Sequence, residues 1–217
     1  MEVIVCLGFT LTKTRENRTR VLYYKKFDNY QQYVNLQGIK AHIISDRMLA
    51  DKKKNIERFV RLIEASEDNL INEKVLCLGA RDGSEVDAFE KKGFKNSIGI
   101  DLHPIGSDVV RGDWHNLPFS NQLFENVFIN SVDHCLDLEK LIREIYRVLR
   151  NHGILFLVVD QRLNEKRTIF EKINGGKYET LFWDDADDLI RPFEKNGFIL
   201  FNRDRLGKHV CLFFKKT

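Results

Sequence analysis

The sequence has little proline, little cysteine and no long apolar run, and each shortage limits what the protein can be. Its longest apolar stretch, Ile154 to Val159, is far shorter than the ~20 residues that a membrane-spanning helix needs. The apolar start of the chain, Val3 to Leu11, follows no basic segment, so we do not expect a secretory signal peptide. These features predict a protein without a membrane partner.

The cysteines and the charges bear on the location of the protein and on its partners. None of the four cysteines shows a CxxC or other metal-ligand spacing, and three lie in apolar, strand-like runs, where a free thiol packs as a small hydrophobe. This usage predicts a reduced, cytoplasmic protein. With 35 basic and 32 acidic residues, the net charge of +3 offers little attraction to a polyanion. We therefore expect no nucleic-acid partner.

The 217 residues suffice for one sizeable core, and the pattern divides them into two parts. Residues 1–73 are expected to form an accessory segment, which is a candidate lid with Tyr30, Tyr33 and Lys40. Residues 74–217 are expected to form the main domain. The accessory segment contains two β-prone stretches, which predict a hairpin, and two helical ones: Glu2 to Leu11, Arg20 to Phe27, Tyr30 to Lys40 and Asp46 to Glu64.

From Lys74 onward, strand and helix patterns alternate, which predicts an α/β fold, doubly wound around a mostly parallel seven-stranded sheet. Because only about six residues separate the last two strands, these two must form an antiparallel hairpin. Helices are expected at Ser84 to Lys92, after the cap residue Asp137, and at Asp184 to Glu194, with Asn151-His152-Gly153 ending the second. Strands are expected at Lys74 to Leu78, Ser97 to Ile100, Asp108 to Arg111, Phe124 to Asn130, Ile154 to Val159, Phe198 to Asn202 and His209 to Phe214.

In such a sheet, ligands bind at the carboxyl ends of the strands. After the first strand, Gly79-Ala80-Arg81-Asp82-Gly83 opens a helix. As a G-x-G-x-x-G fingerprint it keeps only the first glycine, because Arg81 and Ser84 occupy the other two positions. The second glycine normally lets the backbone touch a pyrophosphate. Its absence disfavours NAD, FAD and nucleotides, and leaves an adenosyl ligand without pyrophosphate.

Asp101 follows the second strand, about 20 residues beyond Gly79, where a carboxylate accepts hydrogen bonds from ribose hydroxyls. A lone acid at this place is more often a helix cap or a solvated loop residue. The combination of strand, glycine loop, helix, strand and acid is much scarcer, and it predicts a nucleoside site.

Four segments in this order resemble the successive motifs of class I S-adenosylmethionine-dependent methyltransferases, of the type 11 domain kind. The resemblance extends from about Lys74 to Phe214 and implies a Rossmann-like fold, S-adenosylmethionine as cofactor and methyl transfer as activity. The segments are Val75 to Gly83, Ile98 to Asp101, Gly112 to Phe119 and Glu144 to Gly153.

The resemblance also implies roles for single residues. The Gly79 loop would hold the methionine end of the cofactor, Asp101 the ribose, and Asp113 the adenine amino group, with Trp114 beside the ring. The full set of cofactor-binding candidates is Gly79, Ala80, Arg81, Gly83, Asp101, Leu102, Asp113, Trp114 and Asn130.

Two positions depart from the family pattern. Cys77 stands where the family usually has an acid, and Arg81 stands where it usually has a glycine. Cys77 cannot organise the loop through carboxylate hydrogen bonds. Arg81 either contacts the cofactor carboxylate or points to solvent.

The catalytic candidates follow the fourth strand. Methyl transfer from a sulfonium needs mainly alignment, and a base is required only when the attacking atom must lose a proton. His134 is the candidate base and Asp133 its partner, although a structural His134 bonded to backbone is the commoner case. Asp133 and Asp160 both end strands, but two carboxylates make a thin Mg²⁺ site, so no metal is expected.

The sequence therefore predicts a methyltransferase that acts on a small molecule. A protein that binds the cofactor without turnover is one alternative, and an RNA or protein methyltransferase is another. Against the latter, the chain has no Asn-Pro-Pro-Tyr-like motif after the fourth strand, no Pro-Cys nucleophile and no large basic domain.

Overall fold

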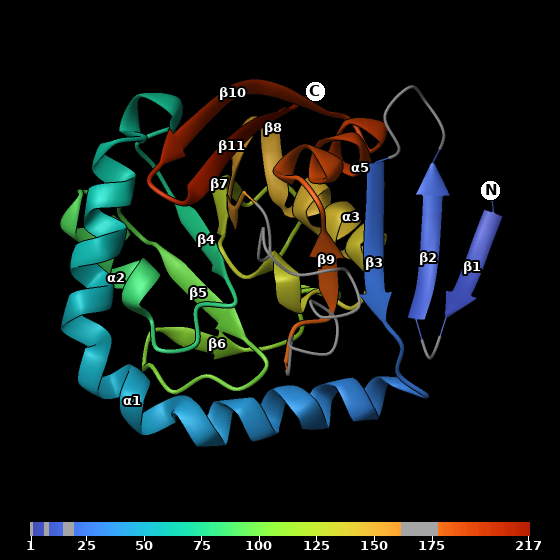
Figure 1. Cartoon of the computed structure of the whole chain (residues 1–217). Coiled ribbons are helices and arrows are strands. Elements are labelled where there is room, and N and C mark those ends of the chain that lie inside the picture. The colour runs from blue at the N-terminus through green and yellow to red at the C-terminus, as the bar shows by residue number, and fades with distance from the viewer. Residues whose placement is uncertain (1, 7–8, 15–19, 162–177) are drawn as a thin grey trace.

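The computed structural model describes residues 2–6, 9–14, 20–161 and 178–217, and a seven-stranded sheet lies at the centre of this part (Figure 1). Five neighbouring strands of this sheet are mutually parallel, whereas the last strand of the chain runs antiparallel to both of its neighbours. This confirms the predicted mostly parallel sheet with its C-terminal hairpin. In spatial order the strands are β10 (Phe198–Leu206), β11 (His209–Lys216), β8 (Leu149–Asp160), β7 (Phe124–Ile129), β4 (Val75–Leu78), β5 (Ile98–Asp101) and β6 (Val109–Arg111).

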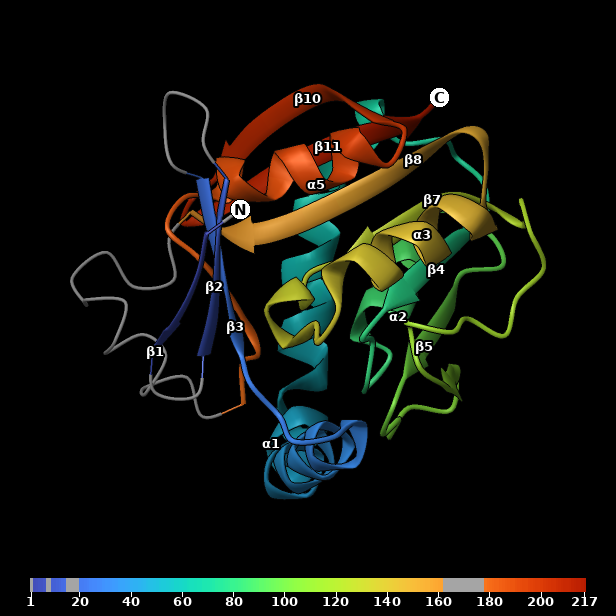
Figure 2. The same cartoon turned by 90° about the vertical axis from the view of Figure 1, so that its right-hand side faces the viewer.

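Helices cover both faces of this sheet (Figure 2). On one face, α1 (Tyr30–Glu64) and α2 (Ser84–Lys91) contribute Phe59, Val86 and Phe89 to a core against Phe128 of β7. On the other face, α3 (Leu138–Val148) and α5 (Ile190–Lys195) pack on a second core. The predicted helix from Asp184 to Glu194 is divided, because a 3₁₀ helix, η3 (Ala186–Leu189), precedes α5.

Helix α3 shows how local sequence sets an element in place. Asp137 caps it by accepting a hydrogen bond from the Lys140 amide, as its position before an apolar repeat predicts. Leu141, Ile142 and Ile145 are fully buried, and burying each such side chain stabilises the fold by ~1.5–3 kcal/mol. The predicted stop at Asn151 to Gly153 is wrong, because β8 already begins at Leu149 and continues through these residues.

The two helices predicted before the main domain are one helix of 35 residues. Figure 1 shows α1 bending between a first part along one edge of the molecule and a second part that rises beside α2. Within it, the Ser45 hydroxyl donates to the Ala41 carbonyl, a bond of the kind that bends helices. No described helix is both long and apolar enough to span a lipid bilayer.

A second sheet has four strands in the described part of the chain, in the order β1-β2-β3-β9. These are β1 (Glu2–Cys6), β2 (Phe9–Thr14), β3 (Arg20–Lys25) and β9 (Leu181–Trp183). The predicted hairpin is present as β2 and β3, and the first predicted strand is divided into β1 and β2. Strand β9 was not predicted. It pairs Trp183 with Leu22, so residues from both predicted parts of the chain share this sheet.

Candidate functional site

A cavity of about 260 Å³ lies at the carboxyl ends of β4, β5 and β7, where doubly wound sheets bind their ligands. Both catalytic candidates, Asp133 and His134, line it. Three predicted cofactor residues, Ala80, Gly83 and Asp113, are not among its lining residues. The predicted cofactor residues that do line it are Gly79, Arg81, Asp101, Leu102, Trp114 and Asn130.

Gly79 occupies a place that no larger residue can fill. Its φ of 72° lies in the left-handed region, and its amide donates to the Ile100 carbonyl at 2.8 Å. A Cβ atom here would collide with the Ser131 hydroxyl and lie 3.1 Å from the Trp114 ring. The glycine therefore keeps backbone exposed on the cavity wall between two side chains.

Arg81 and Asp101 form an ion pair in the wall, with 3.5 Å between Arg81 Nε and Asp101 Oδ1. Arg81 is only 8% exposed, so its side chain does not extend into solvent. Asp101 Oδ1 also accepts a hydrogen bond of 2.7 Å from the His103 amide. Within the part of the chain that the structure describes, Asp101 Oδ2 accepts no hydrogen bond, which leaves acceptor capacity on a carboxylate that lines the cavity.

Asp113 is held by protein groups on both oxygens. Oδ1 accepts from the amide and from Nδ1 of His115, each at 2.8 Å, and Oδ2 accepts from the Tyr30 hydroxyl at 2.8 Å. Burial acts to raise the pKa of Asp113, but these hydrogen bonds hold its pKa below the ordinary value. The predicted bond from Asp113 to an adenine amino group stays a prediction, whereas Trp114, its neighbour, lines the cavity.

His134 faces a lysine of α1 across the cavity wall. Its Nδ1 lies 3.0 Å from the Tyr178 carbonyl, which can only accept, so Nδ1 carries the proton. Its Nε2 therefore accepts, and Lys40 Nζ lies 2.5 Å from it. Burial lowers the pKa of Lys40, although Asp133 nearby opposes the change. His134 thus is bonded to backbone through one ring nitrogen and faces the cavity with the other.

Glu85 is an acidic lining residue that the sequence analysis did not identify as part of the site. It is 7% exposed, in the first turn of α2. Its Oε1 accepts a hydrogen bond of 3.3 Å from Asn130 Nδ2, and its Oε2 is buried without a partner. An acid on the buried face of a helix, beside Val86 and Phe89, was the available signal.

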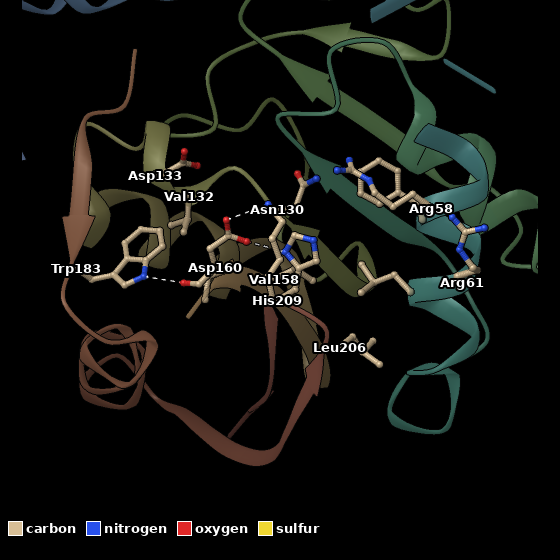
Figure 3. A pocket seen from close by; sticks show the side chains of 14 residues that line it. Arg58, Arg61, Asn130, Val132, Asp133, Val158, Asp160, Trp183, Leu206 and His209 are labelled. Carbon is tan, nitrogen blue, oxygen red and sulfur yellow. Dashed lines mark hydrogen bonds and ion pairs between the residues drawn. The ribbon is translucent and has the colours of Figure 1, made fainter. Parts of the chain in front are cut away.

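A second cavity, of about 370 Å³, adjoins the first and shares Arg58, Asn130 and Asp133 with it (Figure 3). Figure 3 shows Trp183 on one side and Arg58 with Arg61 on the opposite side. Apolar side chains from α1, β8 and β10 also line this cavity: Phe59, Leu62, Val158, Val159 and Leu206.

Asp160, at the end of β8, lies in the wall of this second cavity. Its carboxylate pairs with His209 Nδ1 at 2.8 Å and with Lys208 Nζ at 3.3 Å. Its backbone carbonyl accepts from Trp183 Nε1 at 3.1 Å. Basic groups therefore already hold Asp160, which disfavours it as a metal ligand.

One group of three residues in the described part of the chain has metal-ligand spacing. Oxygen and nitrogen atoms of Asp133, His134 and Glu179 all lie within 4.8 Å of one another. The Nζ atom of Lys40 lies against the His134 nitrogen that would bind an ion. Because this nitrogen already accepts from Lys40, its lone pair is not open to an ion, and the group carries no metal assignment.

Comparisons with known proteins agree on one kind of domain. Residues 76–157 match the family described as Methyltransferase domain. The chain is 26% identical, over 140 residues, to "Putative methyltransferase YrhH" of Bacillus subtilis (strain 168), covering 57% of this chain and 78% of that protein. It is 31% identical over 94 residues to phthiotriol/phenolphthiotriol dimycocerosates methyltransferase 1 of Mycobacterium ulcerans (strain Agy99), covering 42% of this chain and 35% of that protein.

Among solved structures, the chain is similar to the 1,6-didemethyltoxoflavin-N1-methyltransferase of Burkholderia thailandensis, solved with 1,6-didemethyltoxoflavin and S-adenosylhomocysteine bound. The TM-score is 0.64 at 13% identity, and the match covers 95% of this chain and 99% of that one. At this identity the likeness concerns the fold alone.

Proposed function

Residues 76–157 form a methyltransferase domain of the class I, S-adenosylmethionine-dependent family, and on this premise we propose that the chain methylates a small molecule. S-adenosylmethionine is the cofactor of this family. The small-molecule acceptor, the site residues and the catalytic roles below are parts of the proposal.

The polar atoms of the first cavity fit this cofactor. Within the described part of the chain, three of its lining residues have a buried polar atom without a hydrogen-bond partner: Arg81 Nε, whose only contact of this kind is the ion pair with Asp101 at 3.5 Å, Trp114 Nε1 and Glu85 Oε2. Such atoms are rare in folded proteins, because each loses its bonds to water and gains none in return. Their gathering around one cavity is the observation that carries the proposal, since a polar ligand would complete their hydrogen bonds.

The arrangement also suits the parts of the ligand. The exposed backbone at Gly79 permits close approach, and the free acceptor capacity of Asp101 suits ribose hydroxyls. Trp114 offers a flat apolar surface to a purine. These residues would bind the cofactor over β4 and β5 and leave the second cavity for the acceptor.

We place the acceptor in the second cavity, next to the shared residues Asn130 and Asp133. Trp183 and the apolar wall suit a flat apolar body. Arg58 and Arg61 form no ion pair in the described part of the chain, so they suit an anionic group on the acceptor. The expected acceptor is therefore a small, partly apolar anion.

When bound, S-adenosylmethionine would supply a methyl group to the acceptor atom, which bonds to the methyl carbon as the carbon–sulfur bond breaks, so that S-adenosylhomocysteine leaves as the second product. The cavity residues contribute mainly alignment and exclusion of water. Where the attacking atom is an N–H or O–H, its proton must leave as the bond to carbon forms.

Lys40 and His134 would accept this proton as a pair. With His134 Nε2 accepting from Lys40, the open lone pair of a neutral pair lies on Lys40 Nζ. A lysine with a lowered pKa is neutral in a larger fraction of molecules at a given pH, so it can act as a base. His134 would then orient the Lys40 amine and stabilise the ammonium group that forms. Asp133 Oδ2, which lies 3.6 Å from His134 Nε2, would add its negative charge.

The test begins with the ligand and ends with turnover. Calorimetry should show binding of S-adenosylmethionine and S-adenosylhomocysteine, and absence of heat at millimolar ligand would contradict the cofactor site. A panel of small aromatic carboxylates, assayed for S-adenosylhomocysteine formation, then tests the acceptor class. Binding without turnover on any member, with RNA and protein substrates also tested, would favour the alternative of a cofactor-binding protein.

Two further parts of the proposal concern the role of the N-terminal segment and the location of the protein in the cell. The segment before residue 74 would act as the cover of the site, supported by the α1 residues Tyr33 and Lys40 in the cavity wall. A cytoplasmic location stays a prediction, supported by Cys77, Cys135 and Cys211, which are free thiols.

A further inference from the structure

Strand β4 lacks a carboxylate where the family usually has one. Cys77 stands at that position and is fully buried. Burial raises the pKa of the Cys77 thiol, and the negative charge of Glu85 acts in the same direction. Cys77 is therefore neutral. The carboxylate that acts on it is that of Glu85, which belongs to α2, the helix that follows the glycine loop.

The surroundings of Glu85 leave one of its oxygens available. Oε1 is held by Asn130 at 3.3 Å, whereas Oε2 is buried and accepts no hydrogen bond. No ion pair reaches Glu85 within the part of the chain that the structure describes, and Arg58 acts on it only at longer range. A buried carboxylate without a cation is costly, and a ligand cation beside it would remove that cost.

The cofactor brings one suitable cation. Its methionine end carries an α-ammonium group, and Glu85 lines the same cavity as Gly79, the start of the loop assigned to that end. We infer that Glu85 binds the α-ammonium group of S-adenosylmethionine through Oε2, and so supplies from α2 the carboxylate that β4 lacks. Asn130 positions this carboxylate through its bond to Oε1.

Titration gives the inference a second consequence. Burial raises the pKa of Glu85 to about 7, with its own backbone amide and Arg58 opposing the effect and Asp82 adding to it. Near neutral pH, part of the free protein therefore carries a protonated Glu85. Binding of an ammonium group favours the ionised form, so cofactor binding would release a proton from Glu85.

Binding measurements without turnover test this inference separately from the acceptor. The variants are Glu85→Gln and, as a matched control on the same helix, Glu90→Gln, whose side chain is exposed. The probes are S-adenosylhomocysteine and its desamino analogue, in which hydrogen replaces the α-ammonium group. Calorimetry at pH 7 measures both affinities, and buffers of different ionisation enthalpy reveal proton release.

We expect Glu85→Gln to weaken S-adenosylhomocysteine binding at least 10-fold and to leave the affinity for the desamino analogue unchanged. Glu90→Gln should change neither affinity. The parent protein should release a proton with S-adenosylhomocysteine, and Glu85→Gln should not. Equal weakening of both probes would mean that Glu85 only supports the fold, and no weakening of either would place the ammonium elsewhere; both results would overturn the inference.

Discussion

Nε2 of His134 lies 2.5 Å from Nζ of Lys40, although 94 residues separate the two in the chain. The opposite ring nitrogen bonds the Tyr178 carbonyl, so the ring is fixed by backbone and still presents a nitrogen to the cavity. The sequence offered a catalytic and a structural His134 as alternatives. In this geometry Nδ1 makes the structural bond to backbone, and Nε2 is the nitrogen available for the catalytic role.

The pair gives the first prediction. His134→Gln and Lys40→Met should each lower turnover roughly 10²–10⁴-fold, the usual effect of losing acid–base catalysis, with little change in cofactor affinity. Since the two act as a unit, the double variant should lose scarcely more than either single one. Turnover should also rise with pH as Lys40 loses its proton, over a range below that of an ordinary lysine. Full activity in Lys40→Met would contradict the role.

Gly79 gives the second prediction, with Gly93 as its control. Both have a positive φ, 72° and 89°, so alanine is strained at either place. Only at Gly79 does the new Cβ meet side chains, those of Ser131 and Trp114, whereas nothing lies within 4 Å at Gly93. Gly79→Ala should therefore weaken S-adenosylhomocysteine binding at least ~10-fold, about 1.4 kcal/mol, and Gly93→Ala should leave it unchanged in calorimetry.

Asp101 gives the third prediction. Asp101→Asn should weaken cofactor binding by about 1–3 kcal/mol, because charge-assisted bonds to the ribose are lost and the buried Arg81 loses its partner. The exposed Asp108, replaced by asparagine, serves as control. Affinity for free adenosine separates the two causes, since that ligand retains the ribose. An unchanged adenosine affinity would show that Asp101 does not bind the ribose.

Much of the sheet was predictable because it depends on local patterns. The apolar residues of α3 recur at helical spacing, and Asp137 precedes them, so both the helix and its cap follow from adjacent residues. The parallel direction of most strands follows from the alternation of strand and helix. These features need no knowledge of distant contacts.

Several features that the sequence did not reveal depend on distant contacts. Strand β9 has three residues and is defined by pairing with β3, some 160 positions earlier, so no local pattern reveals it. The hydrogen bond from Tyr30 to Asp113 was not predicted, since Tyr30 is 83 residues away, and the bond from Asp113 to adenine stays a prediction. Glu85 looks from sequence like an ordinary first-turn acid, favoured by the helix dipole. Its place beside Val86 on the apolar face of α2 hints at burial, but only packing shows that it lines the cavity.

Glu85 gives the last prediction, on the ligand-free protein. Its pKa is raised by burial from an ordinary 4.5 to about 7, so between these values the folded state binds more protons than the unfolded state. The contribution of Glu85 to stability is therefore greatest below about pH 4.5 and is lost as the pH rises to about 7, by up to ~3 kcal/mol. Glu85→Gln cannot titrate, so urea unfolding at pH 5 and pH 7.5 should show the variant gaining stability relative to the parent at the higher pH. Asp82, Arg58 and the other groups that face Glu85 remain in both proteins, so the difference isolates this one carboxyl. A difference that does not change with pH would mean that Glu85 ionises normally, and that its buried oxygen is satisfied without a ligand.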